Sequence, residues 1–257
     1  MLLFCEIILA FFIFFTGTCI FSFLNVIVYR VPKKISFIKG HSVCPCCGHK
    51  LGAPDLIPVF SYIFLRGKCR YCKASFGSRD TWVELLGGIL ALVCAHHYEN
   101  MGTALTAFAF FSVLTVVTFL DIDTMEIEDS CWMAVAALTV CAVFTMPGVS
   151  FAERAVGLFA VSVPMLLMTL AVEGAFGGGD IKLMAACGLF MGAKLVLIST
   201  ALAILFGGGY GIYLLAAHKK ERRDHFAFGP FLCLGMLLGL LYGERLFQWY
   251  TGLFLVW

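Results

Sequence analysis

The stretch LFCEIILAFFIFFTGTCIFSFLNVIV, residues 3–28, decides the fold class of this chain. At ~1.5 Å per residue, a helix of this length crosses a hydrocarbon core of ~30 Å. A cleaved signal peptide is the alternative interpretation. However, no basic segment precedes the run, no Ala-x-Ala site follows it, and Arg30, Lys33 and Lys34 come next. We therefore interpret it as an uncleaved first transmembrane helix.

The rest of the chain is equally apolar. Hydrophobic residues make up 61% of the 257 residues and charged residues 13%, a composition that excludes a soluble enzyme or a disordered chain. We predict an all-α polytopic membrane protein with about eight transmembrane helices. After the first, they are centred on residues 83–97, 104–120, 130–146, 155–172, 181–191, 195–217 and 226–242.

Two of the apolar segments are too short to span a bilayer. Ile181–Met191 would form only about 16 Å of helix, so we expect it to be extended, to lie partway in, or to be buried among neighbours. The tail Leu246–Trp257 contains Trp249, Tyr250 and Trp257, which suit a position at the membrane interface.

Basic residues gather in two segments. Ten of the 18 Lys and Arg residues lie in the long polar loop from Arg30 to Arg79, and four more are Lys219, Lys220, Arg222 and Arg223. With eight spans, both segments lie on one side of the membrane. Because Lys and Arg accumulate in cytoplasmic loops, this distribution predicts an outer N-terminus and a cytoplasmic polar loop.

Five of the twelve cysteines are crowded into this loop. Two C-x-x-C pairs, Cys44/Cys47 and Cys69/Cys72, have close to the spacing of a zinc ribbon, and Cys46 is left over. Disulfide pairing is the alternative, but a reducing cytoplasm disfavours it. The pattern predicts a structural zinc ion held by four thiolates.

Two acidic residues lie at the ends of apolar runs. Asp121 ends one such run, and Asp180 follows three glycines, Gly177, Gly178 and Gly179. Carboxyl groups at membrane depth are costly and indicate function. Two that share a proton can activate water, one as a general base and one as a general acid. Solvated loop acids are the alternative interpretation.

At these residues the sequence resembles a known family. The segment 177–183, GGGDIKL, looks like the G-x-G-D motif of the type IV prepilin peptidases, which are polytopic aspartyl proteases. The segment 119–123, FLDID, resembles their first catalytic motif. Further similar segments are SFLNVIVYRVP (22–32), CPCC (44–47), DLIP (55–58), SY (61–62), LRGKCRYC (65–72), VEL (83–85) and FGPF (228–231).

The resemblance implies which residues act. It assigns catalysis to Asp121 and Asp180, with Asp123 as the open alternative for the first acid. It also implies two activities: cleavage of prepilin or pseudopilin leaders after a Gly at the cytoplasmic face of the inner membrane, and N-methylation of the new terminus with S-adenosylmethionine. Candidate substrate- or cofactor-binding residues are Gly177, Gly178, Gly179, Lys182, Asp55 and Glu84.

The corresponding domain organisation has three parts. Residues 1–29 form the first transmembrane helix, 30–80 the four-cysteine loop, and 81–257 the peptidase domain. Prepilins and the lipid bilayer are the expected partners, with no nucleic acid. A transporter or a non-enzymatic zinc scaffold is the alternative function. The acids Asp123, Glu126, Glu128 and Asp129 are expected either to attract a basic leader or only to solvate a turn.

Overall fold

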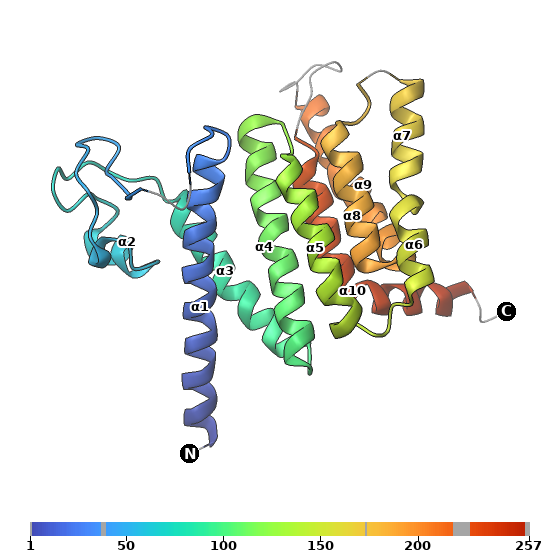
Figure 1. The fold of residues 1–257 in the computed structure, drawn as a ribbon, viewed down its shortest axis with the longest axis horizontal. Coiled ribbons are helices and arrows are strands. Elements are labelled where there is room, and N and C mark those ends of the chain that lie inside the picture. The colour runs from blue at the N-terminus through green and yellow to red at the C-terminus, as the bar shows by residue number, and fades with distance from the viewer. Residues whose placement is uncertain (1, 37–39, 173, 218–226, 255–257) are drawn as a thin grey trace. The chain divides into compact units, whose positions relative to one another are not determined.

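The computed structural model describes residues 2–36, 40–172, 174–217 and 227–254. The basic residues Lys219, Lys220, Arg222 and Arg223 lie outside these ranges. The described residues are almost entirely helical and contain no β-strand beyond two isolated bridges. The chain forms two compact units, Met1–Ala104 and Leu105–Trp257 (Figure 1). Each unit has its own internal packing.

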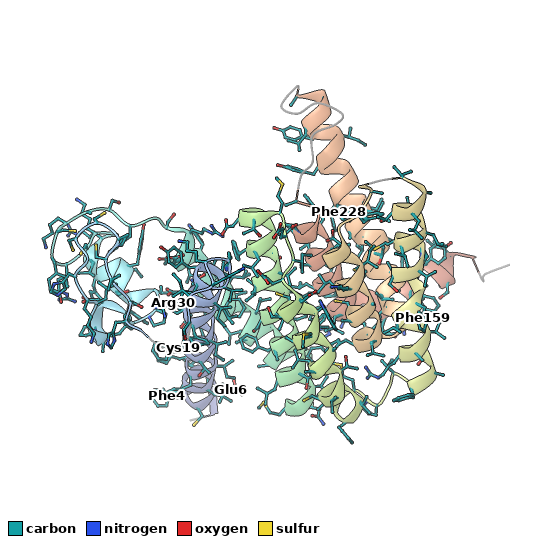
Figure 2. All side chains as sticks on the ribbon, turned by 45° about the horizontal axis from the view of Figure 1, so that its top comes forward. Phe4, Glu6, Cys19, Arg30, Phe159 and Phe228 are labelled. Atoms are coloured by element: carbon teal, nitrogen blue, oxygen red, sulfur yellow. The ribbon has the colours of Figure 1, made fainter. Side chains whose placement is uncertain are left out.

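In the first unit two long helices pack side by side. Helix α1 (Leu2–Arg30) runs antiparallel to α3 (Arg79–His97), and Figure 2 labels Phe4 and Arg30 towards opposite ends of α1. A Cβ on Gly17 would lie 2.5 Å from the carbonyl oxygen of Gly87, so these glycines let the two backbones approach closely.

The loop between these helices contains little regular structure. It holds a 3-10 turn, η1 (Ala53–Asp55), and the short helix α2 (Phe60–Leu65). The bridges Val43–Lys50 and Lys68–Ser75 close two small turns within it. A segment with so few paired backbone groups needs another source of order.

The second unit is a bundle of helices. Its members are α4 (Met101–Thr124, which begins in the last residues of the first unit), α5 (Asp129–Thr145), α6 (Phe151–Ala160), α7 (Ser162–Ala171), α8 (Gly178–Met191), α9 (Ala193–Ala216) and α10 (Gly229–Phe254). Helices α6 and α7 follow one another as two parts of one apolar segment.

Five helical segments among the described residues are long and apolar enough to cross a membrane. They are Leu3–Arg30, Met101–Thr124, Phe151–Ala171, Ala193–Leu214 and Gly229–Leu253. The all-helical prediction is confirmed, whereas the count of eight transmembrane helices is not. The tail from Leu246 differs from the prediction of a separate short segment, because it continues α10 as far as Phe254.

The short helix α8 lies at the centre of the second unit. It contacts α5, α6, α7, α9 and α10. The ring of Phe190 in α8 stacks on the ring of Phe110 in α4, with 4.2 Å between the ring centroids. A Cβ on Gly188 would lie 2.0 Å from the carbonyl oxygen of Gly157, so α6 and α8 meet backbone to backbone. Of the three alternatives that the sequence leaves open for this short apolar segment, the structure shows burial among neighbouring helices.

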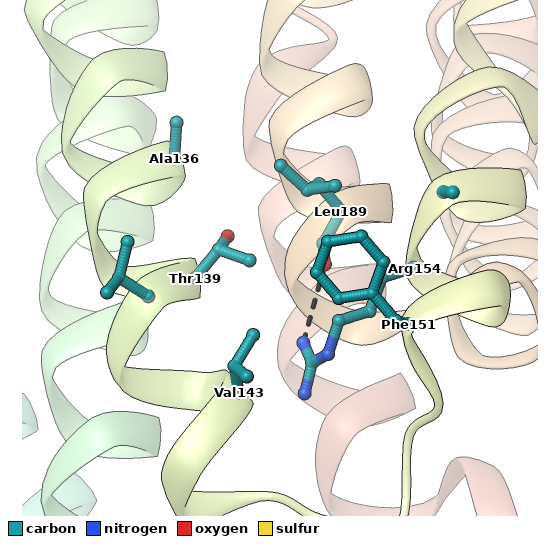
Figure 3. A pocket seen from close by; sticks show the side chains of 8 residues that line it. Ala136, Thr139, Val143, Phe151, Arg154 and Leu189 are labelled. Atoms are coloured by element: carbon teal, nitrogen blue, oxygen red, sulfur yellow. Dashed lines mark hydrogen bonds between the residues drawn. The ribbon is translucent and has the colours of Figure 1, made fainter.

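A buried arginine of α6 forms hydrogen bonds with the C-terminal ends of α5 and α8. The Arg154 side chain is only 2% exposed and contacts no carboxylate among the described residues. Its guanidinium donates to the carbonyl oxygens of Phe190 (2.5 Å), Ala142 (3.0 Å) and Met146 (3.2 Å), with a longer contact to Leu189 (3.4 Å) (Figure 3). These carbonyls belong to the C-terminal ends of α5 and α8, where a cation offsets the helix dipoles.

Candidate active site and candidate metal centre

Asp121 lies in the last turn of α4 and is nearly enclosed. Its side chain is 6% exposed, and its Oδ2 accepts a hydrogen bond of 2.8 Å from the backbone N–H of Gly229, the first residue of α10. A Cβ at position 229 would lie 2.6 Å from the same oxygen. Only glycine therefore allows the start of α10 to approach this carboxyl group so closely.

Asp180 lies in the first turn of α8. Its Oδ2 accepts a hydrogen bond of 3.2 Å from the N–H of Gly177, which precedes the helix, while its buried Oδ1 has no hydrogen-bond partner among the residues that the structure describes. The carboxyl groups of Asp121 and Asp180 are close enough to interact electrostatically. The fold thus brings together two acids that are far apart in the sequence.

The turn between α4 and α5 packs against the beginning of α8. A Cβ on Gly179 would lie 2.9 Å from the Cβ of Ile127, so glycine is required at this contact. The Lys182 Nζ donates to Asp129 Oδ1 at 2.8 Å, and the indole N–H of Trp132 donates to the same oxygen at 2.7 Å. These contacts hold the first turn of α8 against the segment from Asp123 to Asp129, which we call the acidic turn.

The other sequence-predicted residues of this region differ in environment. Asp123 is exposed, in contrast to the buried Asp121 two residues earlier. A Cβ on Gly178 would meet no atom within 4 Å, so the backbone beside Asp180 faces open space. Lys182 is not a free cation, because Asp129 already pairs with it. Of the predicted glycines, Gly177 and Gly179 have specific contacts and Gly178 does not.

The four predicted metal ligands of the first unit lie together. The Sγ atoms of Cys44, Cys47, Cys69 and Cys72 are all within 4.8 Å of one another, and Cys46 is outside the cluster. The Sγ atoms of Cys44 and Cys72 are 3.8 Å apart. A tetrahedral zinc ion with Zn–S bonds of ~2.3 Å requires S···S separations of about this size. The donor set therefore fits zinc.

Two similar turns present these thiols. In the first, the N–H of Gly48 donates to the carbonyl of Cys44 at 2.9 Å, and in the second the N–H of Lys73 donates to the carbonyl of Cys69 at 3.0 Å. Gly48 and Lys73 both have positive φ, 69° and 62°. Backbone N–H groups at Cys47 and Cys46 lower the pKa of the Cys44 thiol to about 6, which favours the thiolate that binds metal.

A cavity of about 440 Å³ lies beside the cysteine turns, within the first unit. Both predicted polar residues, Asp55 and Glu84, contribute to its wall, together with the aromatic ring of Tyr62. Glu84 Oε2 accepts from the N–H of Val59 at 2.8 Å. Asp80, Phe76, Lys68 and Arg79 also line it, so the fold gathers three acidic residues, two aromatic residues and two basic residues around one space.

Asp55 is largely occupied by contacts within the loop. Its Oδ1 accepts from Arg70 Nε at 2.6 Å, and its Oδ2 accepts from the N–H of Gly52 at 3.1 Å. The Arg70 guanidinium holds the pKa of the Asp55 carboxyl below its usual value. Asp55 therefore joins η1 to the second cysteine turn. Glu84 differs from Asp55 in that it accepts from a backbone N–H and not from a cation.

Sequence reasoning did not find two of the residues that shape the carboxyl site. Gly229 was recognised only as part of a motif, with no indication that its N–H would reach Asp121. Arg154 belongs to neither of the two basic segments, and a single arginine near the start of an apolar run is the signal that could have indicated its buried role.

The fold and the two sites define a class. The chain is a helical membrane-type protein with a pair of interacting carboxyl groups at helix ends and a separate cluster of four thiols. Two family models match it: the bacterial peptidase A24 N-terminal domain over residues 15–98, and the type IV leader peptidase family over residues 108–212. The chain belongs to the type IV leader peptidase family.

Curated relatives agree over nearly the full length. The chain is 28% identical to a prepilin leader peptidase/N-methyltransferase of Aeromonas salmonicida (strain A449), over 93% of each chain. It is 29% identical to a protein of that name from Burkholderia pseudomallei (strain 1026b), over 88% of this chain and 83% of the relative. The Bacillus subtilis (strain 168) relative is 27% identical, over 93% and 96%. No solved structure matches the chain.

Proposed function

We propose that this protein is a membrane aspartyl endopeptidase that removes the leaders of prepilins or pseudopilins and then methylates the new N-terminus. The observation that carries the proposal is the carboxyl pair, in which Asp121 and Asp180 interact across two helix ends. The names of the curated relatives, prepilin leader peptidase/N-methyltransferase, support both activities.

The proposed cleavage uses one water molecule and one shared proton. Asp121, whose Oδ2 is fixed by the Gly229 N–H, removes a proton from water as the water oxygen attacks the scissile carbonyl carbon. Asp180, held protonated beside that charge, donates its proton to the carbonyl oxygen. When the tetrahedral intermediate collapses, the C–N bond breaks. The amine then takes the proton from Asp121, and Asp180 regains its own.

The proposed substrate enters from the cytoplasmic side. The resemblance implies a short basic leader cleaved after a Gly, with the new terminus often Phe. Ten of the 18 Lys and Arg residues lie in the polar loop after α1, and this bias supports a cytoplasmic cysteine loop, an outer N-terminus and an inner-membrane location. The open backbone at Gly178 leaves room for an extended peptide beside Asp180.

The cysteine cluster is proposed to hold a structural zinc ion. Four thiolates that complete a tetrahedron leave no open coordination position, which is the arrangement of structural rather than catalytic zinc. Cys44, Cys47, Cys69 and Cys72 would hold the ion, and its role would be to fix a loop that lacks a core of its own.

S-adenosylmethionine is the proposed methyl donor, and the cavity beside the cysteine turns can accommodate it. Its volume of about 440 Å³ is within the range of small-molecule sites. Glu84 and Asp55 would favour the positive charges of the donor, and Tyr62 offers a ring surface. When bound, the donor supplies an activated methyl group. A transporter or a passive zinc scaffold is less favoured, because neither accounts for the carboxyl pair.

Substitution of each acid by asparagine tests the peptidase assignment. Because asparagine cannot transfer a proton, Asp121→Asn and Asp180→Asn should each abolish prepilin cleavage by protein reconstituted in vesicles. Asp123→Asn is the matched control, since this exposed carboxyl group belongs to the same turn of α4. Normal cleavage by Asp121→Asn or Asp180→Asn would refute the assignment, and loss only in Asp123→Asn would move the first acid by two positions.

The methylation proposal has its own test. Glu84→Gln keeps the side-chain size and leaves the carboxyl pair untouched, so it should reduce methylation of a precleaved substrate while leader cleavage continues. Mass spectrometry of the product separates the two outcomes. Unchanged methylation would remove Glu84 from the donor site, and loss of cleavage would show that the substitution acts on the fold.

A further inference from the structure

The cysteine loop carries an exposed apolar face that the proposed chemistry does not use. Phe64 is 81% exposed and Ile63 is 61% exposed, and Phe60, Leu56 and Ile57 extend the same apolar surface. Positions 60, 63 and 64 follow the spacing of one helix face, and Leu56 and Ile57 lie in the bend between η1 and α2. Large apolar side chains at this density on a polar loop mark an interaction surface.

The opposite side of α2 faces inward. Ser61, Tyr62 and Leu65 line the cavity beside the cysteine turns. The helix therefore has one face fixed against its own loop and one face directed outward. Phe60, Ile63 and Phe64 form this outward face, which we call the α2 apolar face.

Contacts with α1 place α2 along the length of a candidate transmembrane helix. The side chain of Asn25 donates to the carbonyl of Asp80 at 3.1 Å, which marks the polar end of the α1–α3 pair. The Phe60 ring lies 6.4 Å from the Phe15 ring, centroid to centroid. Phe15 is about 15 Å from Asn25 along the α1 axis, at ~1.5 Å per residue. The contact between Phe60 and Phe15 therefore places one end of the α2 apolar face against the apolar run of α1.

The charge of the loop indicates what covers this face. Residues 30–80 contain ten Lys and Arg residues and only two acids, Asp55 and Asp80. Arg66 and Lys68, which follow α2 directly, are exposed. Basic residues next to an apolar helix face are the combination that binds the surface of an anionic bilayer.

We propose that the α2 apolar face inserts into the acyl-chain boundary of an anionic bilayer and anchors the cysteine loop on the membrane surface. The inference goes beyond leader cleavage and methylation. Insertion places Phe60, Ile63 and Phe64 in lipid beside the α1 apolar run, while the long side chains of Arg66 and Lys68 extend towards the head groups. The loop is then held by lipid on one side and by its metal on the other.

Photo-crosslinking of the full chain tests this placement. Benzoylphenylalanine is introduced at Phe64 or, as the matched control, at Tyr71, which is 47% exposed on the second cysteine turn. Both proteins are placed in nanodiscs of phosphatidylethanolamine and phosphatidylglycerol and irradiated. Lipid adducts should be several-fold more abundant at position 64 than at position 71. Equal adduct yields, or crosslinks from position 64 to a second copy or to a prepilin, would overturn the proposal.

A conservative variant gives an independent reading. Phe64→Trp keeps an aromatic ring at an exposed position, so the fold should be preserved. In vesicles with brominated acyl chains, its added fluorescence over the four native tryptophans should be strongly quenched, whereas that of Tyr71→Trp should not. An added signal at position 64 that is insensitive to brominated lipid would contradict insertion.

Discussion

The carboxyl site and the cysteine cluster are built in opposite ways. Around Asp121, helices meet at glycines: the N–H of Gly229 reaches the carboxyl group, and Gly179 admits Ile127. Around the cysteines there are only short turns and isolated bridges, with the thiols converging on one point. The first site is held by the packing of the bundle, and the second would be held by the metal ion that its four thiols are proposed to bind.

This difference determines what each site tolerates. A site fixed by backbone contact is sensitive to a single added methyl group, because neither backbone can move without shifting a whole helix. A site fixed by a metal tolerates changes around it but fails when a ligand is lost. The four predictions below test this contrast, in order of decreasing effect.

Gly229→Ala should produce the largest effect. The new methyl group would lie 2.6 Å from Asp121 Oδ2, so either the Asp121 carboxyl group or the start of α10 must move and the N–H contact must lengthen. Misplacement of a catalytic group on this scale costs on the order of 10²-fold in kcat. Gly208→Ala in α9 is the control, because a Cβ there meets no atom within 4 Å. Equal prepilin cleavage by both variants would contradict the claim that close packing at Gly229 fixes the Asp121 carboxyl group.

Arg154→Met should destabilise the bundle and weaken cleavage. It would leave the carbonyl oxygens of Phe190 and Ala142 without a donor at the ends of α8 and α5. Buried groups left unsatisfied cost about 1–3 kcal/mol each, so the thermal unfolding midpoint in detergent should fall clearly. The exposed Arg245 supplies the control, Arg245→Met, which should leave the midpoint nearly unchanged. An Arg154→Met protein with an unchanged unfolding midpoint would show that the bundle does not depend on the hydrogen bonds of Arg154.

Replacement of Cys44 and Cys47 by Ser should release the metal with a smaller effect on cleavage. The wild-type protein is expected to contain about one zinc per chain by elemental analysis, and the double variant to contain none. Protease sensitivity within residues 40–76 should rise, while the carboxyl chemistry is retained with weaker substrate handling. Cys46→Ser is the control, because Cys46 lies outside the cluster. Complete loss of cleavage would show that the two sites are not independent.

The acidic turn should give the smallest effect. Since Asp129 is paired with Lys182, attraction of a basic leader would depend mainly on Glu126 and Glu128. Replacing both by Gln should raise KM for a Lys-rich leader a few-fold at low salt, with little change in kcat, because attraction between exposed charges is screened over ~8 Å at physiological salt. Identical kinetics for basic and neutral leaders would leave the turn as a solvated connection.

Much of this arrangement could be predicted from sequence, because its signals are local. Apolar runs predicted the helices, and the spacing of the C-x-x-C pairs predicted a four-thiol cluster. The shortness of the apolar run at Ile181–Met191 excluded an ordinary spanning helix and left burial among neighbours as one of three alternatives, which is the one that the structure shows. Each of these inferences depends on residues close together in the chain.

The contacts that shape the carboxyl site were not predictable in this way. The Gly229 N–H that reaches Asp121 is separated from it by 108 residues, and the carbonyl groups that accept from Arg154 belong to two other helices. Such partners are backbone atoms, which every residue carries, so the sequence contains no pattern for them. The length of the last helix was missed because its polar residues near Glu244 resembled a boundary.

The length of α5 has a consequence for the surrounding lipid. Its 17 residues extend about 25 Å, against a hydrocarbon core of ~30 Å, and its side chains Met133, Val140 and Phe144 are exposed. Hydrophobic mismatch of this size draws the two leaflets closer together where α5 meets lipid. Water then stands nearer to the turn between α4 and α5, which packs against the start of α8 beside Asp180. Bilayer thickness thereby becomes a physical control on hydration of the carboxyl pair, acting without any change in the protein.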